Sequence, residues 1–320
     1  MLFNYIYNIY RKMVYTRADD NGTVFYFSPE DFPGLNCEPF EFKSIDGHNL
    51  KGYFYHYDNF VQNRIIFFDH GLGSGHRGYM REIETLARHG YLVFSYDHTG
   101  CMESGGKDTG GFIQSLKDLN DAINAVTSLN EYSQCDVSVV GHSWGGFSTL
   151  NICALQPKVS HIVSLSGFTS VNNIISQFFP FPLSVFGKKI YAKECDANPQ
   201  FINYDAIESL KKSNVKALII HSVDDKTVNF KKNFTAMKNQ LSSKDNIEFL
   251  SVTGKNHNPN YTDTGVKLLN EFFTERSKLL KKNQLTTEVE KKNFLNRYDW
   301  NKMTEQDPLI WDKIFKNLDK

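Results

Sequence analysis

The sequence predicts an α/β protein in which a mostly parallel, twisted sheet carries helices on both faces. Short, nearly continuous apolar runs, each followed by loop residues, are typical of strands buried on both faces. Such runs occupy residues 65–68, 91–94, 137–140, 161–165 and 217–220. Helix-length amphipathic stretches alternate with them, at residues 79–89, 112–129 and 230–241. This alternation gives the β-α-β-α order of a parallel sheet.

Two further segments complete the predicted sheet. Residues 40–54 alternate in character around Asp46-Gly47, which indicates a hairpin with its turn at that pair. Residues 247–252 have the character of a last strand. Because ligands bind at the carboxyl ends of the strands in open sheets of this kind, functional residues should follow directly after the apolar runs.

Composition narrows the class of protein. The 320 residues, 40% of them hydrophobic, are enough for one large core. Lys and Arg together number 36, as do Asp and Glu, so a nucleic-acid partner is not expected. The mean hydropathy of −0.43 and the lack of a run of about 18 apolar residues predict a soluble chain without a membrane span. Five cysteines without a C-x-x-C pair fit neither a disulfide framework nor a zinc site and indicate reduced thiols in the cytoplasm.

The first chemical motif is Ser143 in Gly-His-Ser-Trp-Gly-Gly at residues 141–146. It follows the predicted strand at residues 137–140 and precedes a helical pattern, which is the strand-turn-helix setting of a G-x-S-x-G nucleophile. Glycines on either side remove Cβ atoms that would collide with neighbouring elements, so the turn can present the hydroxyl. The alternative is a loop serine between packing glycines.

A serine hydroxyl needs a base to take its proton and an acid to orient that base. Asp224 and Asp225 follow the predicted strand at residues 217–220, and His257 follows the one at residues 247–252. The sheet would bring the ends of both strands near Ser143. The chain order is Ser, Asp, His.

With these motifs, the chain from about residue 40 to 280 resembles an α/β-hydrolase. It is most similar to the serine-aminopeptidase-like branch of esterases, lysophospholipases and related peptidases. In that family the acid lies in a pattern like H-G-x-x-D-x-x-V, which residues 221–228 match with Ser222 in place of the glycine. The resemblance implies Asp225, not its neighbour Asp224, as the acid.

The resemblance also implies an oxyanion hole, which needs two N–H donors. One is the backbone N–H of Trp144, directly after the nucleophile. The other is the N–H of Leu72, because His-Gly-Leu-Gly at residues 70–73 resembles the H-G-x-G signature. Residues 97–105 resemble the D-x-R-G-x-G-x-S loop of the family, with Thr99 in place of the arginine, and are expected to be structural.

About fifty residues separate the predicted strands at residues 161–165 and 217–220, more than a bare crossover requires. An insertion at about residues 167–212 resembles the small helical cap of the family. Its aromatic residues are expected to line an acyl pocket or to pack the cap onto the domain: Phe178, Phe179, Phe181 and Phe186. An apolar roof favours acyl or aryl groups over charged ones.

The predicted organisation has three parts: an N-terminal extension at residues 1–37, a catalytic domain at 38–280 and a C-terminal helical tail at 281–320. The aromatic residues 1–10 predict a short helix packed on the domain or a partner, with a weak membrane-surface contact as the alternative; their charge order is unlike that of a signal peptide. Asp307-Pro308 opens a helix with apolar residues at spacings of three and four. That stripe is expected to pack on its own chain, and a homodimer contact is the alternative.

These observations predict a serine hydrolase that cleaves an acyl ester through an acyl-enzyme, in the manner of a carboxylesterase or lipase-like esterase. The substrate would be a small acyl compound, and neither a metal nor an organic cofactor is needed. A peptidase, a thioesterase or an acyltransferase with the same triad is the alternative within catalysis. A non-catalytic binding protein on the same fold is the alternative outside it.

Overall fold

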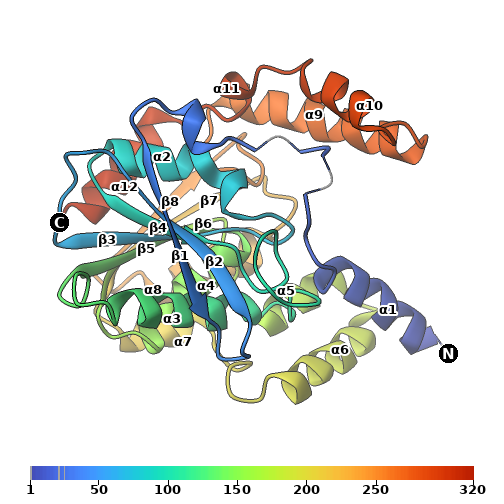
Figure 1. Ribbon diagram of the computed structural model, residues 1–320. Helices are drawn as coiled ribbons and strands as arrows, with labels where there is room; N and C mark the ends of the chain where they lie inside the picture. The colour runs from blue at the N-terminus through green and yellow to red at the C-terminus, as the bar shows by residue number, and fades with distance from the viewer. Residues whose placement is uncertain (1, 21, 25) are drawn as a thin grey trace.

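The computed structural model describes residues 2–20, 22–24 and 26–320 (Figure 1). Within these residues one sheet of eight strands has the order β1-β2-β4-β3-β5-β6-β7-β8. The strands are β1 (Asn36–Lys43), β2 (Asn49–His56), β3 (Arg64–Asp69), β4 (Leu92–Tyr96), β5 (Asp136–His142), β6 (Val159–Leu165), β7 (Lys216–Ser222) and β8 (Ile247–Val252). β1 and β2 form the predicted antiparallel hairpin, β2 pairs antiparallel with β4, and every other neighbouring pair is parallel.

Helices cover both faces of this sheet, with α2 and α12 on one face and α3, α4, α7 and α8 on the other (Figure 1). The helices are α1 (Leu2–Val14), α2 (Met80–Arg88), α3 (Gln114–Thr127), α4 (Trp144–Asn151), α5 (Val171–Phe178), α6 (Ser184–Ala197), α7 (Ala206–Lys212), α8 (Ala236–Leu241), α9 (Asp263–Lys281), α10 (Glu288–Leu295), α11 (Trp300–Met303) and α12 (Pro308–Leu318). None of these described helices combines the length and apolarity required to cross a bilayer.

The two cores explain the apolar runs of the sequence. In β3, Ile65 and Phe67 join the core beneath α3 and α4, while Ile66 and Phe68 join the core beneath α2 and α12. All four side chains are fully buried. Since successive residues of a strand point to opposite faces, only a strand covered on both sides can be apolar at every position. The predicted fold class is confirmed.

Two predicted helices differ in detail from the observed ones. The stretch at 79–89 begins as a 3₁₀ turn, His76–Tyr79, before α2. The stretch at 230–241 begins as a π-helical turn, Lys231–Thr235, before α8. Apolar spacing marks the buried face of a helix but does not distinguish α from 3₁₀ or π hydrogen bonding, so the sequence could not predict these turns.

The C-terminal residues extend the fold. Helix α9 runs without a break across residue 280, the predicted domain boundary, and packs with α10 and α11 around Phe272 and Phe294. Asp307 caps α12 by accepting a hydrogen bond from the Leu309 backbone N–H at 3.0 Å, so the predicted helix start is confirmed. Most of the predicted apolar stripe of α12 is buried in its own chain, against the sheet: Ile310, Trp311, Ile314 and Leu318. Leu309, which the stripe also includes, is 74% exposed.

Candidate active site

Ser143 occupies the sharp turn between β5 and α4. Its backbone has φ +57° and ψ −110°, a left-handed conformation that is strained for a residue with a side chain. The backbone N–H of Ser143 donates to the Leu165 carbonyl at 2.8 Å, which fastens the turn to the end of β6. This hydrogen bond to β6 therefore helps to hold Ser143 in its strained backbone conformation.

The flanking glycines are required by close approach of the backbone. A Cβ on Gly141 would lie 2.3 Å from the Gly145 carbonyl oxygen, and one on Gly145 would lie 2.0 Å from the Asp69 carbonyl oxygen. Helix α4 can begin directly over β3 and β5 only because these atoms are missing. The turn then presents the Ser143 hydroxyl at the carboxyl edge of the sheet, as the sequence predicts.

The structure brings Ser143, His257 and Asp225 together from three strand ends. Ser143 Oγ lies 2.9 Å from His257 Nε2, and His257 Nδ1 lies 2.8 Å from Asp225 Oδ2. With Nδ1–H donating to the carboxylate, Nε2 is free to accept the serine proton. The side chain of His257 is 17% exposed and that of Asp225 is 0% exposed, so only the imidazole meets the solvent-facing side of the site.

Asp225 is held as a carboxylate from several directions. Its Oδ1 accepts hydrogen bonds from the backbone N–H groups of Thr227 at 2.7 Å and Val228 at 2.9 Å. His221 Nε2 lies 3.1 Å from Oδ2. Burial raises the pKa of Asp225, but hydrogen bonds from His221 and His257 outweigh it and hold the pKa well below its usual range. The acid therefore stays ionised opposite the imidazole.

The neighbouring Asp224 serves the backbone of the loop that carries His257. Its carboxylate accepts from the Gly254 N–H at 2.7 Å and from the Asn256 N–H at 3.1 Å. It also accepts from the Ser222 hydroxyl at 2.7 Å. Its carboxylate is thus engaged by the loop, while the imidazole of His257 pairs with Asp225.

The segments expected to supply the oxyanion hole lie on either side of Ser143. Trp144 is the first residue of α4, and backbone N–H groups at a helix N-terminus favour negative charge. The loop after β3 approaches from the other side, since a Cβ on Gly71 would lie 3.5 Å from Ser143 Cβ. Leu72, the next residue, is half-buried in this loop.

The sequence did not predict a hydrogen-bonded chain that lies beside Ser143, His257 and Asp225. The Gly71 N–H donates to the Tyr79 hydroxyl at 3.2 Å, that hydroxyl lies 2.8 Å from His142 Nδ1, and His142 Nε2 lies 2.8 Å from the His257 carbonyl oxygen. Burial, reinforced by His257, lowers the pKa of His142 to about 3, so the ring is neutral. Because a carbonyl only accepts, Nε2 carries the proton and Nδ1 accepts from Tyr79. The chain joins the loop after β3 to the backbone of His257.

Nothing in the sequence singles out Tyr79, and His142 occupies a variable position of the G-x-S-x-G pattern. Their relation depends on the packing of the β3 loop over β5. The position of His142 next to the nucleophile was the one available signal.

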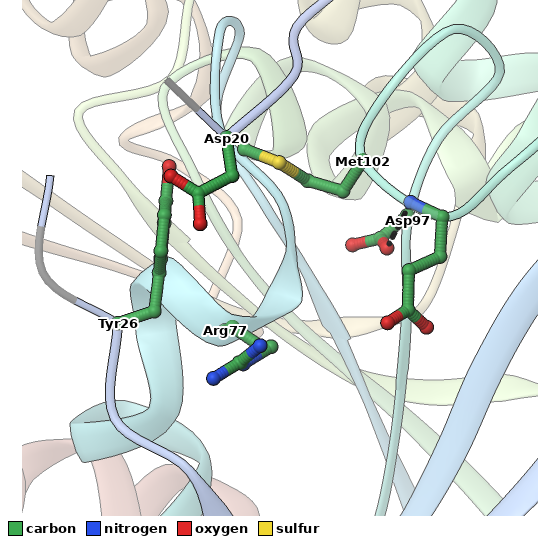
Figure 2. Close-up of a pocket in the computed structure, with 6 residues that line it drawn as sticks. Asp20, Tyr26, Arg77, Asp97 and Met102 are labelled. Carbon is green, nitrogen blue, oxygen red and sulfur yellow. Dashed lines mark hydrogen bonds between the residues drawn. The ribbon is translucent and has the colours of Figure 1, made fainter. Parts of the chain in front are cut away.

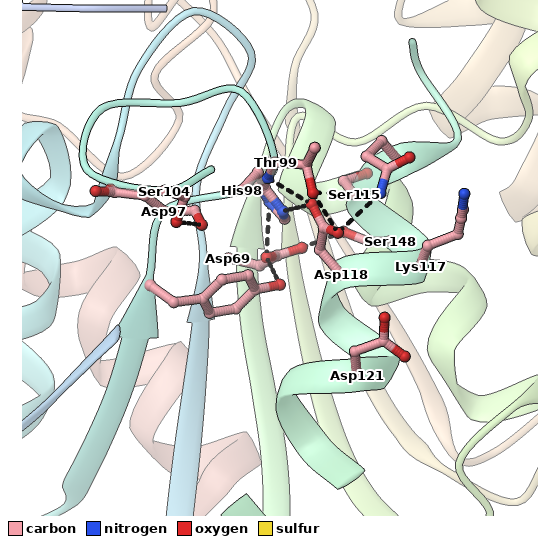
Figure 3. A network of polar contacts seen from close by, with 12 residues as sticks. Asp69, Asp97, His98, Thr99, Ser104, Ser115, Lys117, Asp118, Asp121 and Ser148 are labelled. Atoms are coloured by element: carbon pink, nitrogen blue, oxygen red, sulfur yellow. Dashed lines mark hydrogen bonds and ion pairs between the residues drawn. The ribbon is translucent and has the colours of Figure 1, made fainter. Parts of the chain in front are cut away.

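A second polar cluster joins β3, the loop after β4, α3 and α4 (Figure 3). His98 Nε2 is 3.0 Å from Asp69 Oδ1 and His98 Nδ1 is 3.4 Å from Asp118 Oδ2, with all three side chains 0% exposed. Burial lowers the pKa of His98, but Asp69 and Asp118 outweigh it and raise the pKa to about 9. Asp69 also accepts from the Ser148 hydroxyl of α4, and Asp118 from the Thr99 N–H at 2.7 Å. The ring is an imidazolium that ties the β4 loop to β3 and α3.

A cavity of about 300 Å³ lies between the N-terminal segment, the turn before α2 and the loop after β4 (Figure 2). Gly75 borders it, since a Cβ there would lie 2.5 Å from both Asp97 Oδ1 and Met102 Cγ. The described residues that line the cavity are Asp20, Tyr26, Arg77, Asp97, Met102 and Glu103. None of them is Ser143, Asp225 or His257. The cavity is a neighbour of the oxyanion loop, separate from the nucleophile.

The four cap phenylalanines have different surroundings. Phe178 stacks on Phe112 with the ring centroids 6.3 Å apart, and Phe179 is half-buried against the main core. Phe186 is half-buried, whereas Phe181 is 90% exposed. The main-chain oxygen of Phe112 accepts from the indole N–H of Trp144 at 2.5 Å. Phe178 is therefore linked through Phe112 to the residue after the nucleophile.

Known proteins resemble this chain in sequence and in structure. Residues 62–203 match the model of the serine aminopeptidase S33 family. A monoglyceride lipase of Rattus norvegicus is 32% identical over 113 residues, which are 35% of this chain and 35% of the lipase, so the match spans about a third of that relative. The Pyrococcus furiosus esterase Pf2001 superposes with a TM-score of 0.59 at 18% identity, covering 89% of this chain and 99% of the esterase.

An acetyl xylan esterase from Paenibacillus sp. R4 superposes with a TM-score of 0.55 at 15% identity, over 79% of this chain and 87% of that enzyme. At identities of 15–18%, the superpositions show similarity of fold alone. They show that the chain has the α/β-hydrolase fold, and over residues 62–203 it is similar to the serine aminopeptidase S33 family.

Proposed function

We propose that the protein is a serine hydrolase that cleaves acyl esters, as a carboxylesterase or lipase-like esterase does. The observation that carries this proposal is the continuous chain from Ser143 Oγ to His257 Nε2 at 2.9 Å and from His257 Nδ1 to Asp225 Oδ2 at 2.8 Å. A nucleophile within hydrogen-bond reach of a base, and a base oriented by a buried carboxylate, is the arrangement that acyl transfer requires.

In the first half of the reaction, His257 Nε2 takes the proton of Ser143 as Oγ attacks the acyl carbonyl carbon. The tetrahedral intermediate collapses when the C–O bond to the alcohol breaks and His257 returns the proton to the leaving oxygen. In the second half, water gives its proton to His257 and attacks the acyl-enzyme, which releases the acid and restores Ser143. Asp225 stabilises the imidazolium in both halves.

The backbone N–H groups of Leu72 and Trp144 are proposed to stabilise the oxyanion of both tetrahedral intermediates. The chain through Tyr79 and His142 supports them by holding the β3 loop in register with the backbone of His257. All these groups belong to the polypeptide, so the mechanism uses neither a metal nor an organic cofactor.

The cap, residues 167–212, is proposed to roof the site and to select a small acyl substrate, with Phe179 packed against the main core and Phe178 stacked on Phe112. The names of the lipase and esterase relatives support an ester substrate. Free thiols at all five cysteines support a cytoplasmic setting.

Turnover of matched ester, thioester and aminoacyl amide substrates by the purified chain tests the proposal, with the Ser143→Ala variant as the control for contaminating activity. We expect the ester to be cleaved with the highest kcat/KM. Faster cleavage of the amide would indicate a peptidase, and faster cleavage of the thioester a thioesterase. Ester turnover retained by Ser143→Ala would contradict the assigned nucleophile.

A further inference from the structure

Helix α1 is apolar on two adjacent faces, one buried and one exposed. Its inner face packs on the domain through buried Tyr10 and Val14, and through half-buried Phe3, Ile6 and Tyr7. Its outer face carries a second apolar stripe at spacings of three and four, with side chains between 49% and 66% exposed: Leu2, Tyr5, Ile9 and Met13. One helical face therefore displays apolar side chains to solvent although the other already supplies the packing.

The inner face is fixed to the cap. The hydroxyls of Tyr10 and Tyr15 donate to Glu194 Oε1 of α6 at 2.8 Å and 2.6 Å. Glu194 is 1% exposed, so these hydrogen bonds join the two segments at a buried point. The ammonium of Lys189, also on α6, lies 5.7 Å from the centre of the Phe3 ring. Helix α1 is thereby held on α6, with its outer stripe turned away from the domain.

The cap contributes further exposed apolar residues before and at the start of α6. Phe181 is 90% exposed in the α5–α6 connection, Leu183 is 45% exposed in the same connection, and Val185 is 52% exposed in the first turn of α6. Helices α1 and α6 lie side by side at one edge of the molecule, away from the edge where the chain ends (Figure 1). We call these seven residues the α1–α6 surface: Leu2, Tyr5, Ile9, Met13, Phe181, Leu183 and Val185.

The charges around this surface are mostly basic. Helix α1 has no acidic residue, and its exposed Lys12 lies beside Met13. Helix α6 adds exposed Lys188 and Lys193, of which Lys193 lies 4.0 Å from the exposed carboxylate of Asp196. Glu194 of the same helix is buried under the two tyrosines. The whole chain has a formal net charge of zero, so this excess of lysine is a local property.

We propose that the α1–α6 surface binds peripherally to a phospholipid bilayer that carries anionic headgroups. Apolar and aromatic side chains on one face of a helix, with lysines at their margin, combine hydrophobic insertion with attraction to such headgroups. A contact between two copies of the chain is less suited to this surface. In a two-fold dimer the same surface faces itself, so the excess positive charge of one copy would be brought against that of the other.

Peripheral binding would place the cap against the lipid. Helix α5 opens the cap and ends at Phe178, which stacks on Phe112 beside Trp144. A bilayer at the α1–α6 surface would then bring acyl esters of lipids to the proposed active site. This consequence rests on the proposed function, whereas binding to the bilayer does not.

Co-sedimentation of the full chain with vesicles tests the binding, in the Ser143→Ala background so that hydrolysis plays no part. We expect the protein to sediment with equimolar phosphatidylcholine and phosphatidylglycerol, and to bind less at high salt or to phosphatidylcholine alone. The double variant Tyr5→Gln/Ile9→Gln should partition at least about tenfold more weakly, as should Lys12→Glu/Lys188→Glu. These side chains are exposed, so thermal unfolding should stay as in the parent.

The matched control is Val289→Gln/Leu309→Gln, whose side chains are 69% and 74% exposed on α10 and α12. It should bind vesicles as the parent does. Equal binding by the test and control variants would overturn the proposal, as would failure of the parent to sediment with anionic vesicles. A dimer in solution that Tyr5→Gln/Ile9→Gln converts to a monomer would also overturn it, and would assign the surface to contact between copies. Vesicle binding, together with absent ester turnover by the chain that carries Ser143, would uphold this inference and refute the proposed function.

Discussion

Two histidines at the same edge of the sheet each meet carboxylates, yet their situations are opposite. His257 pairs with one carboxylate, Asp225, is 17% exposed and has a serine hydroxyl 2.9 Å from its other nitrogen. His98 lies between two carboxylates, Asp69 and Asp118, and is 0% exposed. A histidine between two buried carboxylates has no nitrogen left to accept a proton.

The comparison shows which features separate a base from a structural cation. The two carboxylates around His98 raise its pKa to about 9 against the effect of burial, so it keeps its proton at neutral pH. His257 faces only one carboxylate, and its Nε2 points at a nucleophile. Proximity of His and Asp is therefore not enough; a free acceptor nitrogen and an open side are also needed.

The largest effect is expected for Ser143→Ala, which removes the partner that distinguishes His257. We expect kcat for an ester to fall about 10⁴-fold or more, because no other nucleophile is in place. Thermal unfolding should be unchanged or raised, since the strained turn loses only an oxygen. If the variant kept more than a tenth of the turnover of the parent, with contamination excluded, Ser143 would not be the nucleophile.

The next largest effect is expected for Asp225→Asn, which should lower kcat by about 10²–10⁴ through loss of the correct histidine tautomer. The matched control is Asp224→Asn, whose carboxylate holds the backbone of Gly254 and Asn256. That variant should lose less than about tenfold. Single-turnover kinetics of both variants decide the matter, and a reversed order would mean that Asp224 is the acid.

Loss of the Tyr79 hydroxyl should have an intermediate effect. Tyr79→Phe deprives His142 of its donor and the Gly71 N–H of its acceptor while keeping the ring. We expect kcat to fall about tenfold with KM nearly unchanged, since the positions of the oxyanion donors matter most in the transition state. A variant with reduced stability and unchanged kcat would show that the chain only packs the loop.

Acyl-chain length should change specificity in smaller steps. Each methylene that still fits the cap should raise kcat/KM roughly fourfold, until the pocket ends. For p-nitrophenyl esters from acetate to dodecanoate we expect a rise and then a break. Phe178→Ala should move the break to longer chains if the ring closes the pocket, whereas Phe181→Ala, at a residue 90% exposed, should leave it in place. A flat profile in the parent would contradict an acyl pocket under the cap.

The smallest effect on turnover is expected for His98→Gln, below about tenfold, because the ring touches no reacting atom. Its effect should appear in stability. A pKa raised from 6.5 to about 9 stabilises the fold fully below pH 6.5, and this contribution is lost as the pH rises toward 9. The melting temperature of the parent should fall over that interval more steeply than that of His98→Gln. Parallel curves would show that His98 is not the buried cation.

The sequence was most informative where a local pattern carries the constraint. Apolar runs such as residues 65–68 predicted the buried parallel strands, and the glycines around Ser143 predicted the turn. The register of the pattern at residues 221–228 distinguished Asp225 from Asp224, and the geometry around His257 agrees with that choice.

The sequence did not predict contacts between residues that lie far apart in the chain. The sequence does not contain the position of β4 between β2 and β3, because strand order follows from packing of the whole sheet. The link from Tyr10 and Tyr15 to Glu194 joins residues about 180 positions apart. Likewise, the substitution of Thr99 for arginine was visible, but not that the neighbouring His98 is the buried cation between Asp69 and Asp118.

The central claim is that the serine beside His257 is the reactive group of this molecule. Mass spectrometric mapping of the chain after treatment with a fluorophosphonate tests it most directly. The account predicts one adduct, on Ser143, formed by the parent and by His98→Gln at similar rates and far more slowly by Asp225→Asn. An unmodified Ser143, or an adduct on another residue, would contradict it.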